Sequence, residues 1–291
     1  MVWIFSGEDY PRMCEDRRTM MDIQIADIRR ITEVIRNRYD YDFTNYALSS
    51  FKRRVTRILE LNRFGVDVLC DKLEDPSFME YFLNEITVNV TEMYRDPSFW
   101  RVLRDDILPS ILVNHEKIRI WHAGCSSGEE VVSMAILIRE MGIEKNVNVI
   151  ATDLDTRILD RAKKARYALK HMDLNEKNYI RFQGTAQLKD YYEEKDGAAV
   201  MDPTLLENVS FRKHDLVKGI VFNKFDLILC RNVMIYFNQQ LQNEVLKKFH
   251  ESMFKYAYLA IGSKESLIWC EIANKFIVAN NEEKVYRKIK D

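Results

Sequence analysis

The chain has 291 residues, of which 47% are apolar and 31% charged, and its formal net charge at pH 7 is −1. This length allows two hydrophobic cores, so we expect two domains, and the balanced charge excludes a general affinity for nucleic acid or acidic membranes. Because the chain shows neither an apolar run of about 18 residues nor a signal peptide, we expect a cytoplasmic protein that does not insert into membranes.

The first part of the chain has a helical pattern. Residues 1–18 are mixed and polar, and we expect a poorly packed leader there. From Asp22 to Leu112, apolar residues recur at intervals of three and four, which predicts a helical domain over residues 19–114. Within it, Asp75–Pro76 and Asp96–Pro97 are typical of helix starts with proline in the first turn.

After Glu116 the pattern changes to alternating strands and helices. Strands are expected at 118–122, 147–151, 225–230 and 257–262, and helices at 129–141, 156–166 and 238–253. This order predicts an α/β domain over residues 115–291 with a doubly wound, mostly parallel sheet. A closing hairpin is expected from strands around 274–279 and 284–289. Residues 178–212 interrupt the alternation, and we expect a small antiparallel β-subdomain there.

The segment IRIWHAGCSSGEE (118–130) predicts a strand, a tight turn and a helix start. Gly124 and Gly128 would let the backbone approach a ligand at this helix N-terminus, although the two glycines alone also fit an ordinary turn. A complete GxGxxG motif is absent, which disfavours a dinucleotide. Of the two acids that follow, Glu129 is expected to serve the helix start, and Glu130 is the candidate for a ligand site.

Polar residues also follow the next strands. Asp155 is expected to cap the helix that begins near Thr156, which leaves Asp153 for the hydroxyls of a ribose. The segment FDLILC has the pattern of a buried strand, and Arg231, Asn232 and Tyr236 follow it at the carboxyl edge of the sheet, where ligands bind. Asn232 has a structural alternative, because asparagine also shapes turns.

One helix carries a basic face. Arg53, Arg54 and Arg57 fall opposite the apolar residues of their helix, which indicates either a solvated face or a dock for an acidic helical partner. The five cysteines form no CxxC pair and the histidines lack metal-ligand spacing, so we expect free thiols and no metal site. His122 is interpreted as structural.

Four segments, in this order and spacing, resemble the CheR-type chemotaxis receptor methyltransferases over nearly the whole chain. They are ITVNVTEMYRD (86–96), WHAGCSSGEE (121–130), VIATDLDTRILDRAKKARY (149–167) and FDLILCRNVMIYF (225–237). The resemblance implies a Rossmann-like class I methyltransferase. It also implies methylation of glutamate side chains on the cytoplasmic helices of chemoreceptors, with S-adenosylmethionine as methyl donor and S-adenosylhomocysteine as product.

The resemblance also implies site residues. The cofactor site would comprise Asn89, Thr91, Arg95, Gly124, Glu130, Asp153, Asp215, Leu216, Arg231 and Asn232. Asp215 and Leu216 would flank the adenine. Arg95 and Tyr236 would lie near the transferred methyl group and are the expected catalytic residues. The receptor helix would bind the basic face of Arg53, Arg54 and Arg57, and the enzyme is expected to be a monomer.

The chain departs from the family pattern at three places. Gly124–Cys125 stands where relatives often carry alanines, and Asp215 where asparagine is common. Residues 178–212 match poorly the family's small β-subdomain, which tethers a receptor tail in some members. Three alternatives remain: a module that binds the cofactor without catalysis, a methyltransferase for another signalling partner, and a nicotinamide-dependent oxidoreductase, which the incomplete glycine motif disfavours.

Overall fold

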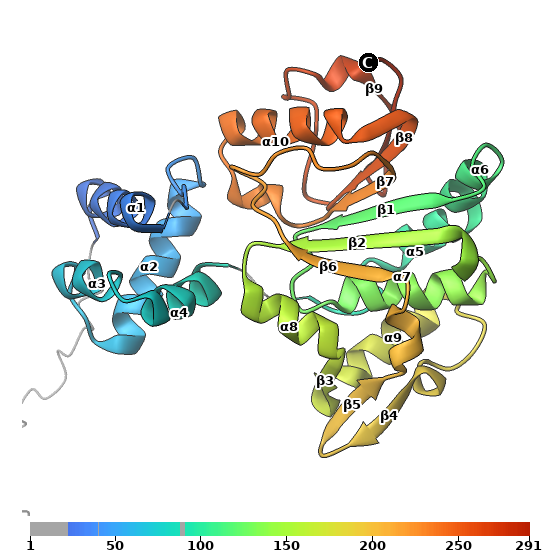
Figure 1. Ribbon diagram of the computed structural model, residues 1–291, viewed down its shortest axis with the longest axis horizontal. Helices are drawn as coiled ribbons and strands as arrows, with labels where there is room; N and C mark the ends of the chain where they lie inside the picture. Colours follow the sequence, from blue (N-terminus) through green and yellow to red (C-terminus); the bar gives the residue numbers. More distant parts are fainter. Residues whose placement is uncertain (1–22, 40, 88–90) are drawn as a thin grey trace, which may run out of the picture.

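The computed structural model describes residues 23–39, 41–87 and 91–291, so the expected leader and Asn89 lie outside the described residues. Four helices form the N-terminal part, on the left of Figure 1: α1 (Ile25–Tyr39), α2 (Leu48–Asn62), α3 (Val66–Lys72) and α4 (Pro76–Ile86). They share one hydrophobic core, because each turns an apolar stripe inward; in α2 that stripe includes Phe51 and Val55. The predicted start of α4 is confirmed, since the Asp75 side chain accepts the Ser77 N–H at 2.9 Å.

The next helical stretch packs elsewhere. It comprises α5 (Pro97–Val102), a π-helical turn (Leu103–Ile107) and α6 (Leu108–Leu112). Phe99, Trp100 and Leu108 are fully buried in the core of the sheet, not among the N-terminal helices. We therefore propose that the domain boundary lies between Thr87 and Met93 and not at residue 114, because helical periodicity predicts a helix but not the core that it joins.

The main sheet has seven strands in the order β6-β2-β1-β7-β8-β10-β9. They are β1 (Ile118–Ala123), β2 (Val147–Asp153), β6 (Val209–Lys213), β7 (Phe225–Cys230), β8 (Met253–Ile261), β9 (Phe276–Asn280) and β10 (Val285–Lys288). The first five of these pair in parallel, and the C-terminal hairpin of β9 and β10 is antiparallel. The predicted doubly wound, mostly parallel sheet and its closing hairpin are thus confirmed.

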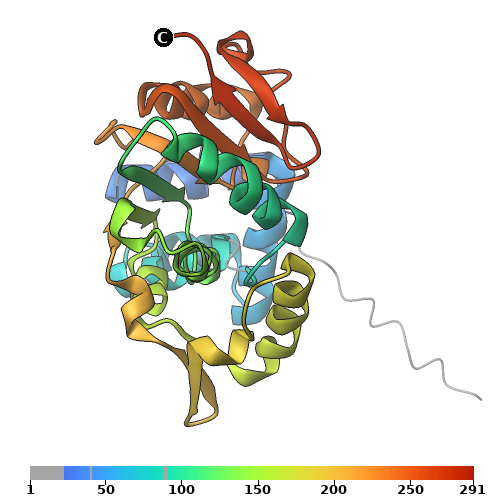
Figure 2. The same cartoon turned by 90° about the vertical axis from the view of Figure 1, so that its right-hand side faces the viewer.

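Helices cover both faces of this sheet. The predicted helices are α7 (Glu129–Glu140), α8 (Thr156–Lys164) and α10 (Gln239–Glu251). Alternation along the strands separates two cores: Ile118 and Ile120 of β1 pack with α5, α6 and α7, whereas Trp121 and Ala123 pack with α10. Figure 2 shows α7 almost end-on within the body of the molecule.

A smaller antiparallel sheet lies at the end of the molecule away from the C-terminal hairpin (Figures 1 and 2). It contains β3 (Arg166–Ala168), β5 (Ala198–Met201) and β4 (Tyr192–Lys195), in that order, and α9 (Met172–Phe182) lies between β3 and β4 in the chain. The expected subdomain exists, but its bounds of 178–212 are wrong at both ends. Helix α8 stops at Lys164 because Ala165 is left-handed (φ 42°), which frees β3; β6, at the other end, pairs with β2 in the main sheet.

Candidate active site

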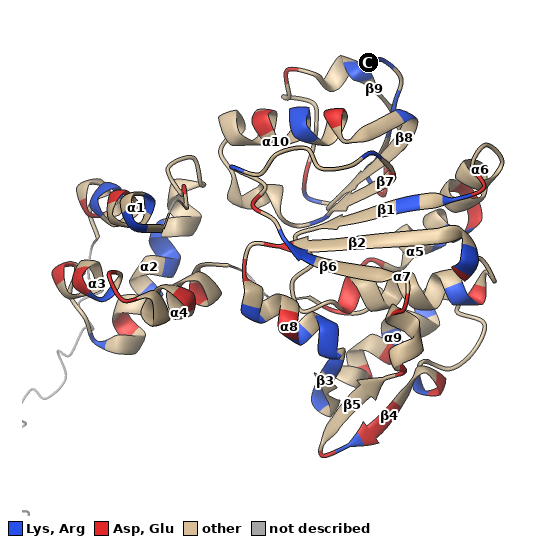
Figure 3. Ribbon diagram, viewed as in Figure 1, with Lys and Arg blue, Asp and Glu red and all other residues tan. Residues whose placement is uncertain are grey.

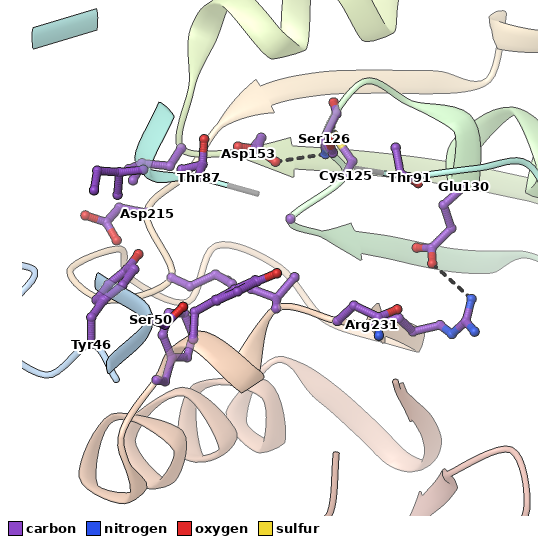
Figure 4. A pocket seen from close by; sticks show the side chains of 18 of the residues that line it. Tyr46, Ser50, Thr87, Thr91, Cys125, Ser126, Glu130, Asp153, Asp215 and Arg231 are labelled. Carbon is purple, nitrogen blue, oxygen red and sulfur yellow. Dashed lines mark hydrogen bonds and ion pairs between the residues drawn. The ribbon is translucent and has the colours of Figure 1, made fainter. Parts of the chain in front are cut away.

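A cavity of about 1200 Å³, including its mouth, opens at the carboxyl ends of β1, β2 and β7. Strand β2, which follows β1 in the chain, lies on one side of β1, and β7 lies on the other side. The strand order therefore reverses its direction at β1, and the cavity lies at this topological switch point of the sheet. Ligands of open α/β sheets bind at such a point. The turns after β1, β2, β6 and β7 line it, together with α2 and the segment before α5 (Figure 4).

The turn after β1 is bound to the end of β2. The N–H groups of Gly124 and Cys125 both donate to the Thr152 carbonyl, at 2.8 and 2.9 Å. Gly124 (φ 81°) lines the cavity, and a Cβ there would lie 2.7 Å from the Val233 side chain. Gly128 (φ 92°) caps α7, and a Cβ there would lie 2.9 Å from that of Ala162. Protein packing therefore accounts for both glycines, and only Gly124 borders the space for a ligand.

Asp153 is held rigidly at the end of β2. Its Oδ2 accepts the Ser126 N–H at 2.8 Å (Figure 4), and its Oδ1 accepts the Asp155 N–H at 3.2 Å. Burial raises the pKa of Asp153, and these two N–H groups act in the opposite direction. Each carboxylate oxygen has a further lone pair, so Asp153 can still accept from hydroxyls in the cavity. Asp155 caps α8 by accepting the Arg157 N–H at 2.8 Å, as predicted.

Glu130 belongs to a network of charged residues at the floor of the cavity. Its Oε1 contacts His122 Nδ1 at 2.8 Å, and its Oε2 lies 3.4 Å from Arg231 Nη1 (Figure 4). Burial acts to raise the pKa of Glu130, but His122 and Arg231 outweigh it and the pKa is lowered. Glu130 is therefore an ionised acid at neutral pH, and His122 has the structural role expected of it.

Arg231 is turned into the protein. Its Nη2 pairs with Asp96 at 2.5 Å, and its guanidinium lies 4.0 Å from the centre of the Phe99 ring. Both terminal nitrogens also lie 3.4 Å from the Arg95 carbonyl, and the side chain is 3% exposed. These contacts occupy both terminal nitrogens, while Nε has no hydrogen-bond partner among the described residues, so the arrangement favours a positioning role for Arg231 over direct contact with a cofactor.

The segment that carries Arg95 is fixed on both sides. Tyr94 and Asp96 are left-handed (φ 52° and 57°), a strained conformation that persists only when neighbours enforce it. Here Ser133 accepts the Tyr94 N–H at 2.9 Å, and the Trp100 indole donates to the Arg95 carbonyl at 3.0 Å. Arg95 lines the cavity, and within the described part of the chain its guanidinium makes no hydrogen bond or ion pair. The expected cofactor residue Thr91 also lines the cavity.

Asp215 and Leu216 line the cavity after β6, together with His214, which the sequence did not predict. One Asp215 carboxylate oxygen accepts the Val217 N–H at 2.7 Å, and the Asp215 carbonyl accepts the Gly219 N–H at 2.7 Å. Asp215 therefore shapes its own turn and retains a second carboxylate oxygen toward the cavity.

The loop after β7 depends on an acid that the sequence reading missed. Asn232 is left-handed (φ 61°), and its N–H donates to Glu265 Oε2 at 3.1 Å. Glu265 also accepts the N–H groups of Ile235, at 3.1 Å, and of Gly262, and it is only 6% exposed. Burial raises the pKa of Glu265, and the backbone N–H groups oppose that shift. Glu265 follows β8 at the carboxyl edge of the sheet, the same signal that singled out Asp153 and Asn232.

The loop ends at Tyr236, which lines the cavity as expected of it. Burial raises the pKa of Tyr236, and Arg54 and Arg95 act against this shift. Tyr236 therefore keeps its proton at neutral pH, and its hydroxyl can donate a hydrogen bond.

The N-terminal helices close one side of the cavity. The Ala47 N–H donates to the Tyr236 carbonyl at 2.8 Å, and the Asn238 N–H donates to the Asn45 carbonyl at 2.9 Å. Between these bonds the Tyr46 ring packs edge-on against Phe237, with ring centres 5.3 Å apart. Tyr46 thereby becomes part of the cavity lining (Figure 4). No local pattern marks this residue, because only the docking of the two domains brings it there.

Basic residues lie along α2 (Figure 3), but their exposure differs from the expected basic face. Arg53 and Arg57 are exposed, as expected. Arg54 is half-buried and lines the cavity, its guanidinium 5.7 Å from the centre of the Tyr236 ring and its Nη1 3.3 Å from the Glu85 carbonyl. The prediction that Arg54 shares an exposed basic surface with Arg53 and Arg57 is wrong, because helical periodicity does not show which part of α2 the second domain covers.

The four cysteines in the described ranges, Cys70, Cys125, Cys230 and Cys270, are free and buried. Burial raises the pKa of Cys125 and of Cys230, which makes both weak nucleophiles. Within those ranges we find no cluster of three or more metal-ligating His, Cys, Asp or Glu side chains. Nor does any helix among them combine the length and apolar character needed to cross a membrane.

Comparison with known proteins covers both parts of the chain. Residues 89–285 match the SAM-binding domain of CheR methyltransferases, and residues 26–87 match the all-alpha domain of CheR methyltransferases. The chain is 39% identical over 278 residues (95% of this chain, 100% of the relative) to Cher3 of Pseudomonas putida, which carries a provisional methyltransferase designation. Proteins named chemotaxis protein methyltransferase are 31% identical in Listeria innocua (81% and 88% covered) and 29% identical in Vibrio cholerae (90% and 90% covered).

Proposed function

The chain belongs to the CheR methyltransferase family, and from this we propose that it transfers the methyl group of S-adenosylmethionine to glutamate side chains of chemoreceptors. The products are a glutamate methyl ester and S-adenosylhomocysteine. The observation that carries the proposal is that Asp153, a rigidly held acid suited to a ribose, shares one cavity with Arg95 and Tyr236. We place the reaction in the cytoplasm, where the methylated receptor helices are expected, and we expect a monomer.

The cavity fits S-adenosylmethionine in the chemistry of its side chains. Asp153 has lone pairs for the two ribose hydroxyls, and ionised Glu130 matches the charge of the cofactor's ammonium group. Asp215 and Leu216 lie together at the edge of the cavity, where they would hold the adenine. Arg95 supplies positive charge for a carboxylate.

Bound S-adenosylmethionine supplies an electrophilic methyl group: a carboxylate oxygen bonds to the methyl carbon, the C–S bond breaks, and its electron pair stays on sulfur. The substrate glutamate has an ordinary pKa of about 4.3, so at neutral pH it is already the anionic nucleophile and needs no general base. The protein therefore has to attract, align and desolvate this carboxylate. Correct alignment alone accounts for several kcal/mol of barrier reduction.

Arg95 is the group placed to align the substrate carboxylate. Its backbone is immobilised and its guanidinium makes no ion pair with any described residue, so it can accept an anion at little cost in reorganisation. Arg54 adds a second positive charge beside Tyr236. The Tyr46–Phe237 contact closes the wall next to Tyr236 and excludes water, because a hydrated carboxylate attacks poorly.

The exposed residues Arg53 and Arg57 extend this positive charge along α2, outside the cavity. We propose that they attract the acidic helix that carries the target glutamate. Exposed charge pairs of this kind contribute mainly to the rate and orientation of encounter, and salt weakens them.

The test is incubation of the protein with methyl-labelled S-adenosylmethionine and a cytoplasmic receptor fragment. A glutamate methyl ester releases labelled methanol when the product is treated with base, whereas an N-methyl group does not. The matched control is a fragment in which the methylated glutamates are replaced by alanine. Cofactor binding without base-labile label would refute the proposed transfer and favour a module that binds the cofactor without catalysis.

A further inference from the structure

Two large apolar side chains stand at the tip of a tight turn after β8. The Cys270 N–H donates to the Leu267 carbonyl at 2.9 Å, which puts Ile268 and Trp269 at the two central positions of the turn. Leu267 and Cys270 are 2% and 7% exposed, whereas Ile268 and Trp269 are 74% and 80% exposed. Glycine, proline, asparagine, aspartate and serine dominate such positions. Folding gains nothing from isoleucine and tryptophan there, which points to a role in binding.

The turn is tied to the wall of the cavity. Glu265, two residues before it, accepts the Ile235 N–H at 3.1 Å, and Gln239 donates to the Trp269 carbonyl at 3.2 Å. Ile235 is 38% exposed and directly precedes Tyr236, which lines the cavity. We call Ile235, Ile268 and Trp269 the apolar rim. Because its backbone is held by these bonds, the rim can bind a partner with little loss of conformational freedom.

We propose that the apolar rim docks the receptor helix beside the glutamate that enters the cavity. This inference rests on the proposed function. A helix whose glutamate points into the cavity must lie across its mouth, and its residues three or four positions away lie one turn, about 5.4 Å, along the axis. Apolar residues at those positions would pack against Trp269 and Ile268, and acidic residues would face Arg53 and Arg57 of α2. Buried tryptophan is a frequent source of binding energy at such contacts.

The charges near the turn favour a protein helix over a lipid surface. Residues 262–275 contain two lysines, Lys264 and Lys275, and two acids, Glu265 and Glu271. Glu271 pairs with Lys247 at 2.6 Å. Binding to anionic lipid typically needs a cluster of four to eight basic residues. The rim instead combines apolar side chains with a balanced charge, which suits an amphipathic helix.

The experiment measures methylation of a soluble receptor fragment by the full chain and by Trp269→Ala and Ile268→Ser. We expect the KM for the fragment to rise about tenfold or more, with kcat, cofactor affinity and melting temperature unchanged, because both side chains are exposed. The control is Val113→Ala. Val113 is 83% exposed and precedes β1, so it lies at the opposite edge of the sheet from the cavity.

An unchanged KM in both rim variants would overturn the proposal. If the KM is unchanged and the variants no longer bind vesicles containing anionic lipid, the apolar rim binds lipid instead. If the KM is unchanged and the variants lose a dimer seen for the parent protein, the rim binds a second copy of this chain instead. If the parent protein does not methylate the fragment, the proposed function fails separately. Calorimetric titration of the fragment then decides about the rim: weaker binding by Trp269→Ala than by Val113→Ala supports it, and equal binding refutes it.

Discussion

Removal of the Glu265 carboxylate tests whether this buried acid holds the active-site loop in place. It accepts N–H groups of Gly262, Asn232 and Ile235. Each buried N–H left without a partner costs about 1–3 kcal/mol. Some of the three will find water once the side chain is gone, so we expect Glu265→Ala to lower the free energy of unfolding by about 2–4 kcal/mol.

Glu265→Gln provides a graded comparison. Oε2 accepts from Asn232 and Gly262, whereas Oε1 accepts from Ile235. A glutamine with its oxygen at the Oε2 position keeps two bonds and turns an NH₂ group toward the third donor, so we expect a loss of about 1–2 kcal/mol. Because this loop carries Tyr236, kcat is expected to fall in the order parent, Gln, Ala.

Urea unfolding gives the stability of the three proteins, and the base-labile label gives their turnover. For domains of this size, 1 kcal/mol corresponds to about 2–4 °C in melting temperature, so thermal melts check the same order. The reasoning is wrong if Glu265→Ala unfolds at the same urea concentration as the parent, or if all three proteins turn over equally.

Other residues of the site lead to further predictions. Arg95→Ala should lower kcat at least a hundredfold while the calorimetric affinity for S-adenosylhomocysteine changes less than tenfold; an unchanged methylation rate would contradict the aligning role. Folding lowers the pKa of Glu130, so the ionised Glu130 carboxylate stabilises the folded protein fully at pH values above the ordinary glutamate pKa. This stabilisation is lost as the pH falls through the lowered pKa of the folded state. Between pH 5 and pH 3 the melting temperature of Glu130→Gln should therefore fall less than that of the parent protein. An equal fall in both proteins would refute this. The double charge reversal Arg53→Glu/Arg57→Glu should raise the KM for the receptor fragment at low salt but not at 0.5 M salt, with cofactor binding intact; no salt-dependent change would mean that this face is only solvated.

Much of the fold could be predicted because its strands and helices are strongly periodic or bounded by clear caps. All six residues of β7 are buried and all but Asp226 are apolar, and α8 starts at the predicted cap Asp155. The sequence did not reveal β6, because this edge strand beside β2 has only two apolar residues, Val209 and Phe211, and an alternation that short is too weak a signal. β3 is only three residues long, too short for any periodicity to appear.

Some residues of the candidate site could likewise be predicted from the sequence, and others could not. Asp153, Glu130 and Arg231 follow strands or open a helix, so sheet topology alone brings them to one edge. Tyr46 and Arg54 lie on a different domain, and only tertiary docking places them in the cavity. The sequence also does not show where a side chain points. Arg231 was expected to contact the cofactor and Asp96 to start a helix, whereas the two side chains form an ion pair.

The hydrogen bonds of Asn45 and Ala47 to the segment Tyr236–Asn238 have a thermodynamic consequence. The same backbone shapes the active-site loop and holds the N-terminal helices, so occupancy of the cavity and association of the two domains are coupled equilibria. Coupling of this kind is reciprocal. If a bound ligand strengthens the association of the two domains by some free energy, association of the domains strengthens ligand binding by the same free energy. Weakening the Tyr46–Phe237 contact should therefore reduce cofactor affinity even though neither ring carries a charge.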